Sequence, residues 1–141
     1  MKHILCAVDI SDQTDAKKIL SEAEKLATTY SATLSILTVV PDYGSSWVGS
    51  FFKEGTLKLA TETAMETLRA LTVDVKSRGL NVQHIVEVGT GYEKILSSAN
   101  QIEADLIVVG AHKPDLADHI IGPNAARVVR HATASVMVVR V

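Results

Sequence analysis

The sequence predicts an α/β protein, built as a single doubly wound open sheet of five mostly parallel strands with helices on both faces. Two observations support this fold class. Segments with the apolar spacing of helices alternate along the chain with short apolar runs, which is the pattern of repeated strand–helix–strand units. The run at the first strand, residues 4–8, is continuously apolar, and parallel strands covered on both faces have this character. The 141 residues fit one domain, residues 1–141, that can bury a core without metals or disulfides.

The first strand is expected at residues 2–9, and Ser11 or Asp12 can cap the helix that follows it. The apolar face of this helix recurs at steps of three and four residues and comprises Ala16, Ile19, Leu20, Ala23, Ala27 and Tyr30. The second strand spans residues 32–40 and ends before Pro41.

A long irregular stretch, residues 41–54, separates the second strand from the next helix. Its aromatic residues are Tyr43, Trp47, Phe51 and Phe52. Stretches of this length often form lids or contact surfaces, and the alternative is that the aromatic rings pack back onto the core. One continuous helix is then expected over residues 56–78, and Gly79 ends it.

The second half of the chain continues the alternation. A third strand is expected at residues 82–88, and Thr90 and Glu93 have the spacing of a capping box at the start of the next helix. The fourth strand covers residues 105–109. The last helix covers residues 122–131, with Pro123 as its first helical residue, and the fifth strand covers residues 135–141.

Composition excludes several classes of protein. Lys and Arg number 14 against 16 Asp and Glu, and no basic block occurs, so nucleic acid is not an expected partner. No apolar run is long enough to cross a bilayer, and the start of the chain lacks a secretory pattern, which favours the cytoplasm. The single cysteine, Cys6, lies in an apolar run and is expected to be buried and unreactive. The histidines lack partners at metal-ligand spacing, so no metal site is predicted.

Two glycines point to a site for an anion. Gly110 follows the fourth strand and Gly122 precedes the last helix, where free backbone N–H groups and the helix dipole favour a phosphate. Asp9 ends the first strand and would face these glycines if the first and fourth strands are neighbours. A carboxylate accepts hydrogen bonds, which suits ribose hydroxyl groups. The alternatives are that the glycines are ordinary turn residues and that Asp9 is a cap or turn residue before the first helix.

Together these segments resemble the universal stress protein family over the whole chain. The resemblance rests on residues 2–11 (KHILCAVDIS), 37–40 (LTVV) and 89–91 (GTG), and most specifically on residues 122–132 (GPNAARVVRHA) followed by 136–140 (VMVVR). It implies the strand order 3-2-1-4-5, a role in the stress response and a homodimer joined through the last strand.

Nucleotide-binding members of this family carry the pattern G-x2-G-x9-G-[S/T], with ATP across the strand ends. Gly110 matches its first glycine, Lys113 stands at the second, Gly122 comes one residue early, and Pro123 replaces the hydroxyl residue. With this shorter spacing the chain resembles a subgroup of small bacterial members, and the resemblance implies that members of this subgroup can also hold adenine nucleotides. The resemblance therefore implies ATP, AMP or ADP as the ligand, with Mg²⁺ beside its phosphates. The implied contacts are Ala7, Val8, Asp9, Val39, Gly110, His112, Lys113, Gly122, Asn124 and Ala125.

Three functions remain open at this point. The first is a homodimeric regulatory protein that binds an adenine nucleotide and acts on an unidentified client protein. The second is a slow ATP hydrolase, although no Walker lysine followed by Ser or Thr and no nucleophile beside a base predicts a catalytic centre. The third is a dimeric interaction protein whose pocket has lost its ligand, which Lys113 and Pro123 favour. For Val39 and His112 the alternatives are plain core packing and an exposed loop histidine.

Overall fold

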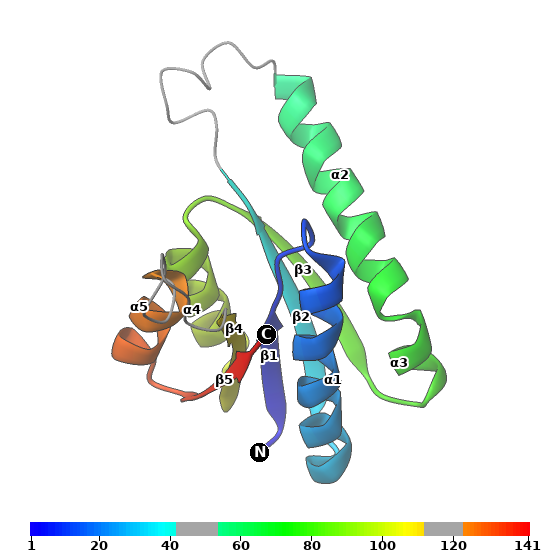
Figure 1. The fold of residues 1–141 in the computed structure, drawn as a ribbon, viewed down its shortest axis with the longest axis vertical. Coiled ribbons are helices and arrows are strands. Elements are labelled where there is room, and N and C mark those ends of the chain that lie inside the picture. Colours follow the sequence, from blue (N-terminus) through cyan, green and yellow to red (C-terminus); the bar gives the residue numbers. More distant parts are fainter. Residues whose placement is uncertain (42–53, 112–122) are drawn as a thin grey trace.

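Five parallel strands form one sheet in the order β3-β2-β1-β4-β5, so the predicted fold class and strand order are confirmed (Figure 1). The computed structural model describes residues 1–41, 54–111 and 123–141. The strands are β1 (His3–Ala7), β2 (Thr33–Val40), β3 (Val82–Val88), β4 (Leu106–Ala111) and β5 (Ser135–Arg140). The predicted irregular stretch with its four aromatic residues falls almost wholly outside the described residues.

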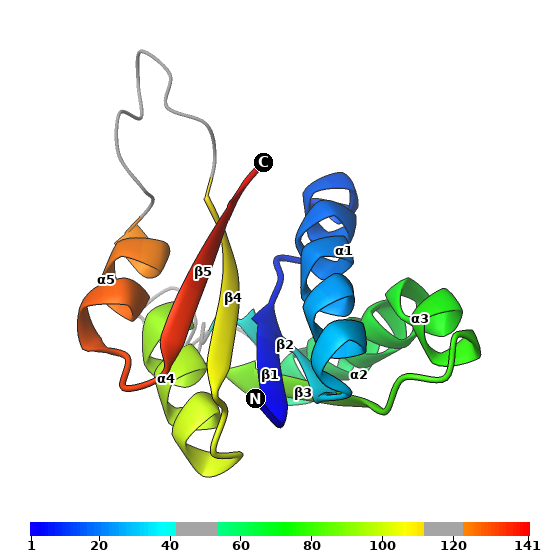
Figure 2. The same ribbon diagram turned by 90° about the horizontal axis from the view of Figure 1, so that it is seen from below.

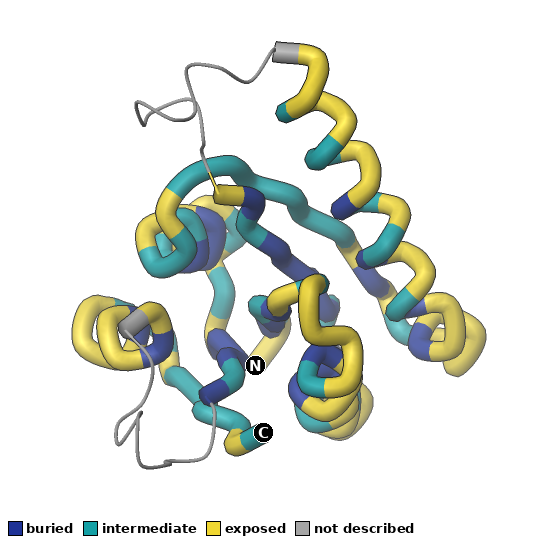
Figure 3. The backbone as a smooth tube through the Cα atoms, turned by 45° about the horizontal axis from the view of Figure 1, so that its top comes forward, coloured by how far each residue is buried: buried dark blue, intermediate teal, exposed yellow. Residues whose placement is uncertain are grey.

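Helices cover both faces of the sheet. One face carries α1 (Gln13–Tyr30), α2 (Glu54–Leu71) and α3 (Val73–Ser77), and the other carries α4 (Gly91–Gln101) and α5 (Pro123–His131) (Figures 1 and 2). Successive strand residues point to opposite faces, so Ile4 and Cys6 join one buried cluster while Leu5 joins the other. Buried residues follow the central strands and the inner sides of the helices (Figure 3). Because both faces are covered, the central strands β1 and β4 are mostly apolar, whereas β2 also buries the polar residues Ser35 and Thr38.

Cys6 lies on β1, the middle strand of the sheet, and is fully buried. Burial raises the pKa of its thiol to about 12, because the thiolate would lose its hydration. The expectation of a buried cysteine is confirmed.

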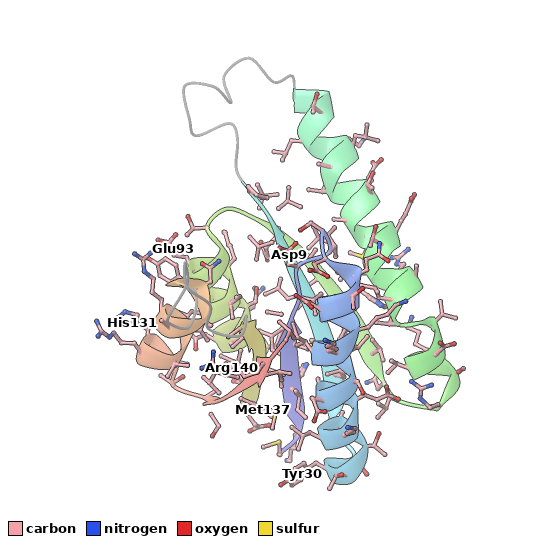
Figure 4. The ribbon with its side chains drawn as sticks, viewed as in Figure 1. Asp9, Tyr30, Glu93, His131, Met137 and Arg140 are labelled. Carbon is pink, nitrogen blue, oxygen red and sulfur yellow. The ribbon has the colours of Figure 1, made fainter. Side chains whose placement is uncertain are left out.

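One of the two residues predicted as the cap of the first helix, Asp12, caps α1. Asp12 is the N-cap, and its carboxylate accepts a hydrogen bond from the Asp15 N–H at 3.1 Å. The predicted apolar face is buried apart from Tyr30, which is 50% exposed. Placing Tyr30 on the buried face was wrong because it is the last residue of α1 and lies at the end of the helix away from Asp9 (Figure 4).

The helix predicted over residues 56–78 is two helices, because α2 ends at Leu71 and α3 starts at Val73. Thr72 between them is fully buried, and its hydroxyl lies 3.2 Å from the carbonyl oxygens of Leu68 and Arg69. The same hydroxyl lies 2.6 Å from Nε2 of His84 on β3. A threonine that bonds to the preceding turn competes with regular helical pairing, and here a neighbouring strand holds it in place.

The capping box predicted at the start of α4 does not form. Thr90 is the N-cap residue, but its side chain makes no capping hydrogen bond. The Glu93 carboxylate instead accepts a hydrogen bond from the Tyr92 hydroxyl at 3.2 Å and does not reach back to Thr90. Within the described residues, no helix is long and apolar enough to cross a lipid bilayer.

Replacing Ser98 by alanine is expected to raise the free energy of unfolding by about 1 kcal/mol, because a buried polar atom without a partner carries its full desolvation cost. Ser98 on α4 is 2% exposed, and its Oγ has no hydrogen-bond partner. The neighbouring Ser97 is exposed and donates to the Lys94 carbonyl oxygen, so Ser97→Ala is the matched control and should change stability little. Urea unfolding measures both; equal effects of the two substitutions would contradict this account.

Asp105 joins the start of β1 to the start of β4, and its contribution should depend on pH. Its Oδ2 accepts hydrogen bonds from the N–H groups of Lys2 at 2.7 Å and His3 at 2.9 Å, which hold the pKa of its carboxyl below the usual value. A carboxyl with a lowered pKa stabilises the folded state above its unfolded pKa, and that contribution is lost as the pH falls through the folded pKa. Asp105→Ala should therefore melt below the wild type at neutral pH, and the two proteins should converge in acid. A gap in melting temperature that stays constant down to the acid limit would refute this role.

Candidate functional site

A cleft of about 830 Å³ opens at the carboxyl ends of β1, β2 and β4. The chain runs from β1 outward to β2 and β3 and then returns to β4 on the other side of β1, so the winding direction reverses between β1 and β4. Open α/β sheets bind their ligands at this switch point. Figure 4 shows Asp9 just beyond the end of β1, above the start of α1.

Every predicted contact residue that the structure describes lines this cleft. These residues are Ala7, Val8, Asp9, Val39, Gly110, Asn124 and Ala125. The remaining predicted contacts, His112, Lys113 and Gly122, lie outside the described residues. The predicted contact residues at the ends of three strands and at the start of α5 therefore lie around one cleft.

Asp9 holds the turn that leads into α1 and also borders the cleft. Its Oδ1 accepts hydrogen bonds from the N–H of Ser11 at 2.9 Å and from the Ser11 hydroxyl at 2.6 Å. Its carbonyl oxygen accepts from the N–H of Asp12 at 3.3 Å. Among the described residues, Oδ2 makes no hydrogen bond. One carboxylate oxygen thus fixes the turn, as the alternative interpretation held, and the other is available to a ligand.

Gly110 lies inside β4 and does not end the strand, which continues to Ala111. A Cβ atom at Gly110 would lie 2.3 Å from Cδ1 and 3.0 Å from Cγ1 of Ile19, on α1. The close packing of α1 against β4 therefore accounts for a glycine at residue 110. From the sequence, this glycine was attributed to the approach of a phosphate. Gly110 still lines the cleft.

Two helices begin at the wall of the cleft opposite α1. Gly91 is the first residue of α4 and Asn124 the second residue of α5, and the Asn124 side chain lies against Gly91. The guanidinium group of Arg127 lies 4.7 Å from the centre of the Tyr92 ring, so a cation–π contact holds the two helices together. Free N–H groups and the positive ends of two helix dipoles make this wall favourable for an anion.

Charge differs between the two walls. The wall at the start of α1 carries three acidic residues, Asp9, Asp12 and Asp15. It suits hydroxyl or other hydrogen-bond donors, while the wall formed by α4 and α5 suits acceptors. A ligand with hydroxyl groups on one side and an anionic group on the other fits this distribution.

Helix α2 supplies a wall of the cleft that was not predicted from the sequence. Ala60, Thr63 and Ala64 line the cleft, and none of the three was among the contact residues predicted from the sequence. Their spacing of three and four residues on one helix was the available signal, since small side chains at such positions leave room beside a helix. Gly89 and Gly91, after β3, also line the cleft.

The sheet, its winding and the cleft at the switch point define a doubly wound α/β protein with a cleft at its strand ends, where this class of fold binds its ligands. Residues 1–140 match the universal stress protein family. A curated relative, universal stress protein G of Salmonella typhimurium, is 30% identical over 145 residues that cover 99% of both chains. The chain therefore belongs to the universal stress protein family.

Solved structures agree with this assignment. Universal stress protein UspA from Lactobacillus plantarum is 28% identical, with a TM-score of 0.75 and coverage of 99% of this chain and 97% of that one. The universal stress protein from Archaeoglobus fulgidus, solved in complex with dAMP, shares the fold at 20% identity, with a TM-score of 0.71 and coverage of 98% and 97%. At least one protein with this fold thus holds an adenine nucleotide.

Proposed function

We propose that this chain is a stress-response regulatory protein that binds an adenine nucleotide, ATP or AMP, in the cleft at the carboxyl ends of β1 and β4. The observation that carries the proposal is the division of the cleft into an acidic wall beside Asp9 and a wall of two helix N-termini. This division matches a molecule with ribose hydroxyl groups at one side and phosphate at the other. The dAMP complex of a protein with the same fold supports the choice of nucleotide.

The adenine ring would lie among apolar side chains. Val8, Val39 and Val40 at the ends of β1 and β2 line the cleft beside Ala60 of α2. Small-molecule sites in proteins are concave and mostly apolar, with a few polar groups that fix the orientation, and the volume of about 830 Å³ is within their usual range. Val39 is half-buried and also packs against the core, so in the proposal it would contact both the core and the adenine ring.

The phosphate groups would lie at the start of α5. The N–H groups of Asn124 and Ala125 belong to the first turn of that helix and lack helical partners. In the proposal, Gly110 borders the part of the cleft that holds the phosphate groups. His112, Lys113 and Gly122 complete this phosphate site, and Lys113 supplies positive charge. Mg²⁺ would accompany ATP through its phosphates.

Calorimetry with AMP, ATP and GMP, with and without Mg²⁺, tests the proposal, together with a native mass spectrum of the freshly purified protein. The expected result is binding of AMP or ATP and weaker binding of GMP. Absence of binding by every adenine nucleotide would refute it and would favour a dimeric interaction protein with a pocket that has lost its ligand. Release of phosphate from bound ATP would identify a slow ATP hydrolase.

The proposal includes a homodimer joined through β5. This strand is at the edge of the sheet and pairs only with β4 among the described strands (Figure 2). Its residues Val136, Met137, Val138 and Val139 are all half-buried. An unpaired apolar edge favours pairing with another chain, and a second copy satisfies this need by two-fold symmetry.

Val138→Lys is expected to convert the dimer to a monomer, because a charge would be placed at the edge that pairs. Analytical ultracentrifugation at micromolar concentration measures the change. Val129→Lys is the matched control, since Val129 lies on α5 and is already 48% exposed. A wild-type monomer, or association unchanged by Val138→Lys, would refute the interface.

The cytoplasm is the proposed compartment. The only cysteine is unpaired and buried, which agrees with a reducing environment although it does not require one.

A further inference from the structure

We propose that Gly91 is a positioning residue for the phosphate end of the ligand: its missing side chain lets the Asn124 carboxamide lie over the first turn of α4, from where it donates a hydrogen bond to a phosphate oxygen. The inference rests on the proposed function and deepens it, because it assigns a specific polar contact to a residue that has no side chain of its own.

The packing at Gly91 is unusually close. A Cβ atom on Gly91 would lie 3.0 Å from Nδ2 of Asn124 and 3.2 Å from both Cγ and Oδ1 of that residue. The whole carboxamide group thus lies over the face of Gly91 from which a side chain would project. Both residues line the cleft.

The backbone does not require glycine at this position. Gly79 and Gly89 are the glycines with positive φ among the described residues, and Gly91 is not one of them. Alanine is more favourable than glycine within a helix, so a glycine at the first position of α4 gives up helix stability. The close contact with the Asn124 side chain explains why residue 91 is a glycine.

The Asn124 carboxamide is available to a ligand. Asn124 is exposed, and its side chain makes no hydrogen bond to a described residue. Its NH₂ group supplies two donors beside the N–H groups at the starts of α4 and α5. The Thr90 side chain does not cap the start of α4, so no threonine hydroxyl occupies the N–H groups of its first turn. Phosphate oxygens accept hydrogen bonds, and the carboxamide NH₂ group offers donors to them.

Alanine at residue 91 would disturb this arrangement without preventing folding. Its Cβ would meet three atoms of the carboxamide at 3.0–3.2 Å, so the group would have to shift or rotate away. The effect would therefore fall on Asn124 and on the ligand atom that it contacts, and not on the adenine or the ribose.

The test compares AMP and adenosine binding by calorimetry for the wild type, Gly91→Ala, Asn124→Ala and the double variant. Each single substitution should weaken AMP binding roughly tenfold, the usual range for a hydrogen bond to a charged group, and leave adenosine binding unchanged. The double variant should be no weaker than Asn124→Ala, because Gly91 acts through Asn124. Gly55→Ala is the control, since a Cβ at Gly55 meets nothing within 4 Å.

The outcomes separate this inference from the proposed function. If the wild type binds neither AMP nor adenosine, both are wrong. If the wild type binds AMP and Gly91→Ala binds it equally well, or if the two substitutions weaken binding additively, only the positioning role is wrong. The side-chain amide NMR signals of Asn124 in the unliganded protein give a second measurement: they should move in Gly91→Ala and stay in place in Gly55→Ala, and unmoved signals in Gly91→Ala would refute the contact.

Discussion

Replacing Ile19 by alanine is expected to lower the free energy of unfolding by about 2–5 kcal/mol, the usual cost of deleting a buried isoleucine side chain. Ile19 is 5% exposed and belongs to the core between α1 and the sheet. Its Cδ1 occupies the space above Gly110 that a side chain at residue 110 would fill. Removing it opens a cavity between a helix and a strand that meet closely. Urea unfolding monitored by circular dichroism measures the loss.

The same contact predicts coupling between the two residues. Gly110→Ala alone should cost about 1–3 kcal/mol through overpacking, because its Cβ would lie 2.3 Å from the Ile19 methyl group. In the Ile19→Ala protein this penalty should disappear, since the added methyl group then fills the vacated space. Gly55→Ala is the control and should stabilise α2 by a few tenths of a kcal/mol to about 1 kcal/mol. Strictly additive effects at Ile19 and Gly110 would contradict the proposed packing.

Replacing Asp9 by alanine is expected to weaken AMP binding by roughly 10- to 100-fold, because a charge-assisted hydrogen bond to the ribose is lost. Asp9→Asn should fall between Asp9→Ala and the wild type. Its side-chain oxygen can still accept the hydrogen bonds from Ser11 that hold the turn, while the charge at the Oδ2 position is removed. Calorimetry measures the affinities, and thermal unfolding shows how much of the effect comes from the turn.

A ligand without sugar hydroxyl groups provides the control for Asp9. With 2′,3′-dideoxy-AMP, the wild type and Asp9→Ala should bind equally, because the carboxylate has no hydroxyl partner. Asp12→Asn is the control protein, since asparagine is also a good N-cap residue and the change removes a charge from the same wall. If Asp9→Ala weakens the dideoxy ligand as much as AMP, Asp9 acts through the turn and not through the ribose.

The sequence predicted the strands well, because strand burial leaves a local signal. The third strand was placed at residues 82–88, as observed, and the ends of the other strands differ by no more than two residues. Helices cover both faces of the parallel sheet, so its inner strands appear as mostly apolar runs, although β2 includes the buried Ser35 and Thr38. The starts of α1 and α5 were also readable, from the capping role of Asp12 and from the preference for proline, here Pro123, at the first position of a helix.

The features that sequence reasoning missed depend on contacts between distant residues. The break between α2 and α3 involves Thr72 and the imidazole of His84, which lie on different elements. The reason for glycine at residue 110 is a side chain on α1, at Ile19. The site residues at the strand ends were predictable because these ends meet at the switch point. The α2 residues that line the cleft were not predictable, because their position depends on how α2 packs against the sheet.

The placement of Cys6 has a consequence for how this protein meets oxidants. Oxidation and alkylation proceed through an accessible thiolate, and a fully buried thiol with a pKa of about 12 offers neither charge nor access near neutral pH. The Cys6 thiol, the only sulfhydryl group in the chain, is therefore unreactive while the protein is folded. It becomes reactive only when β1 leaves the sheet. Thiol labelling of Cys6 therefore reports how often β1 leaves the sheet.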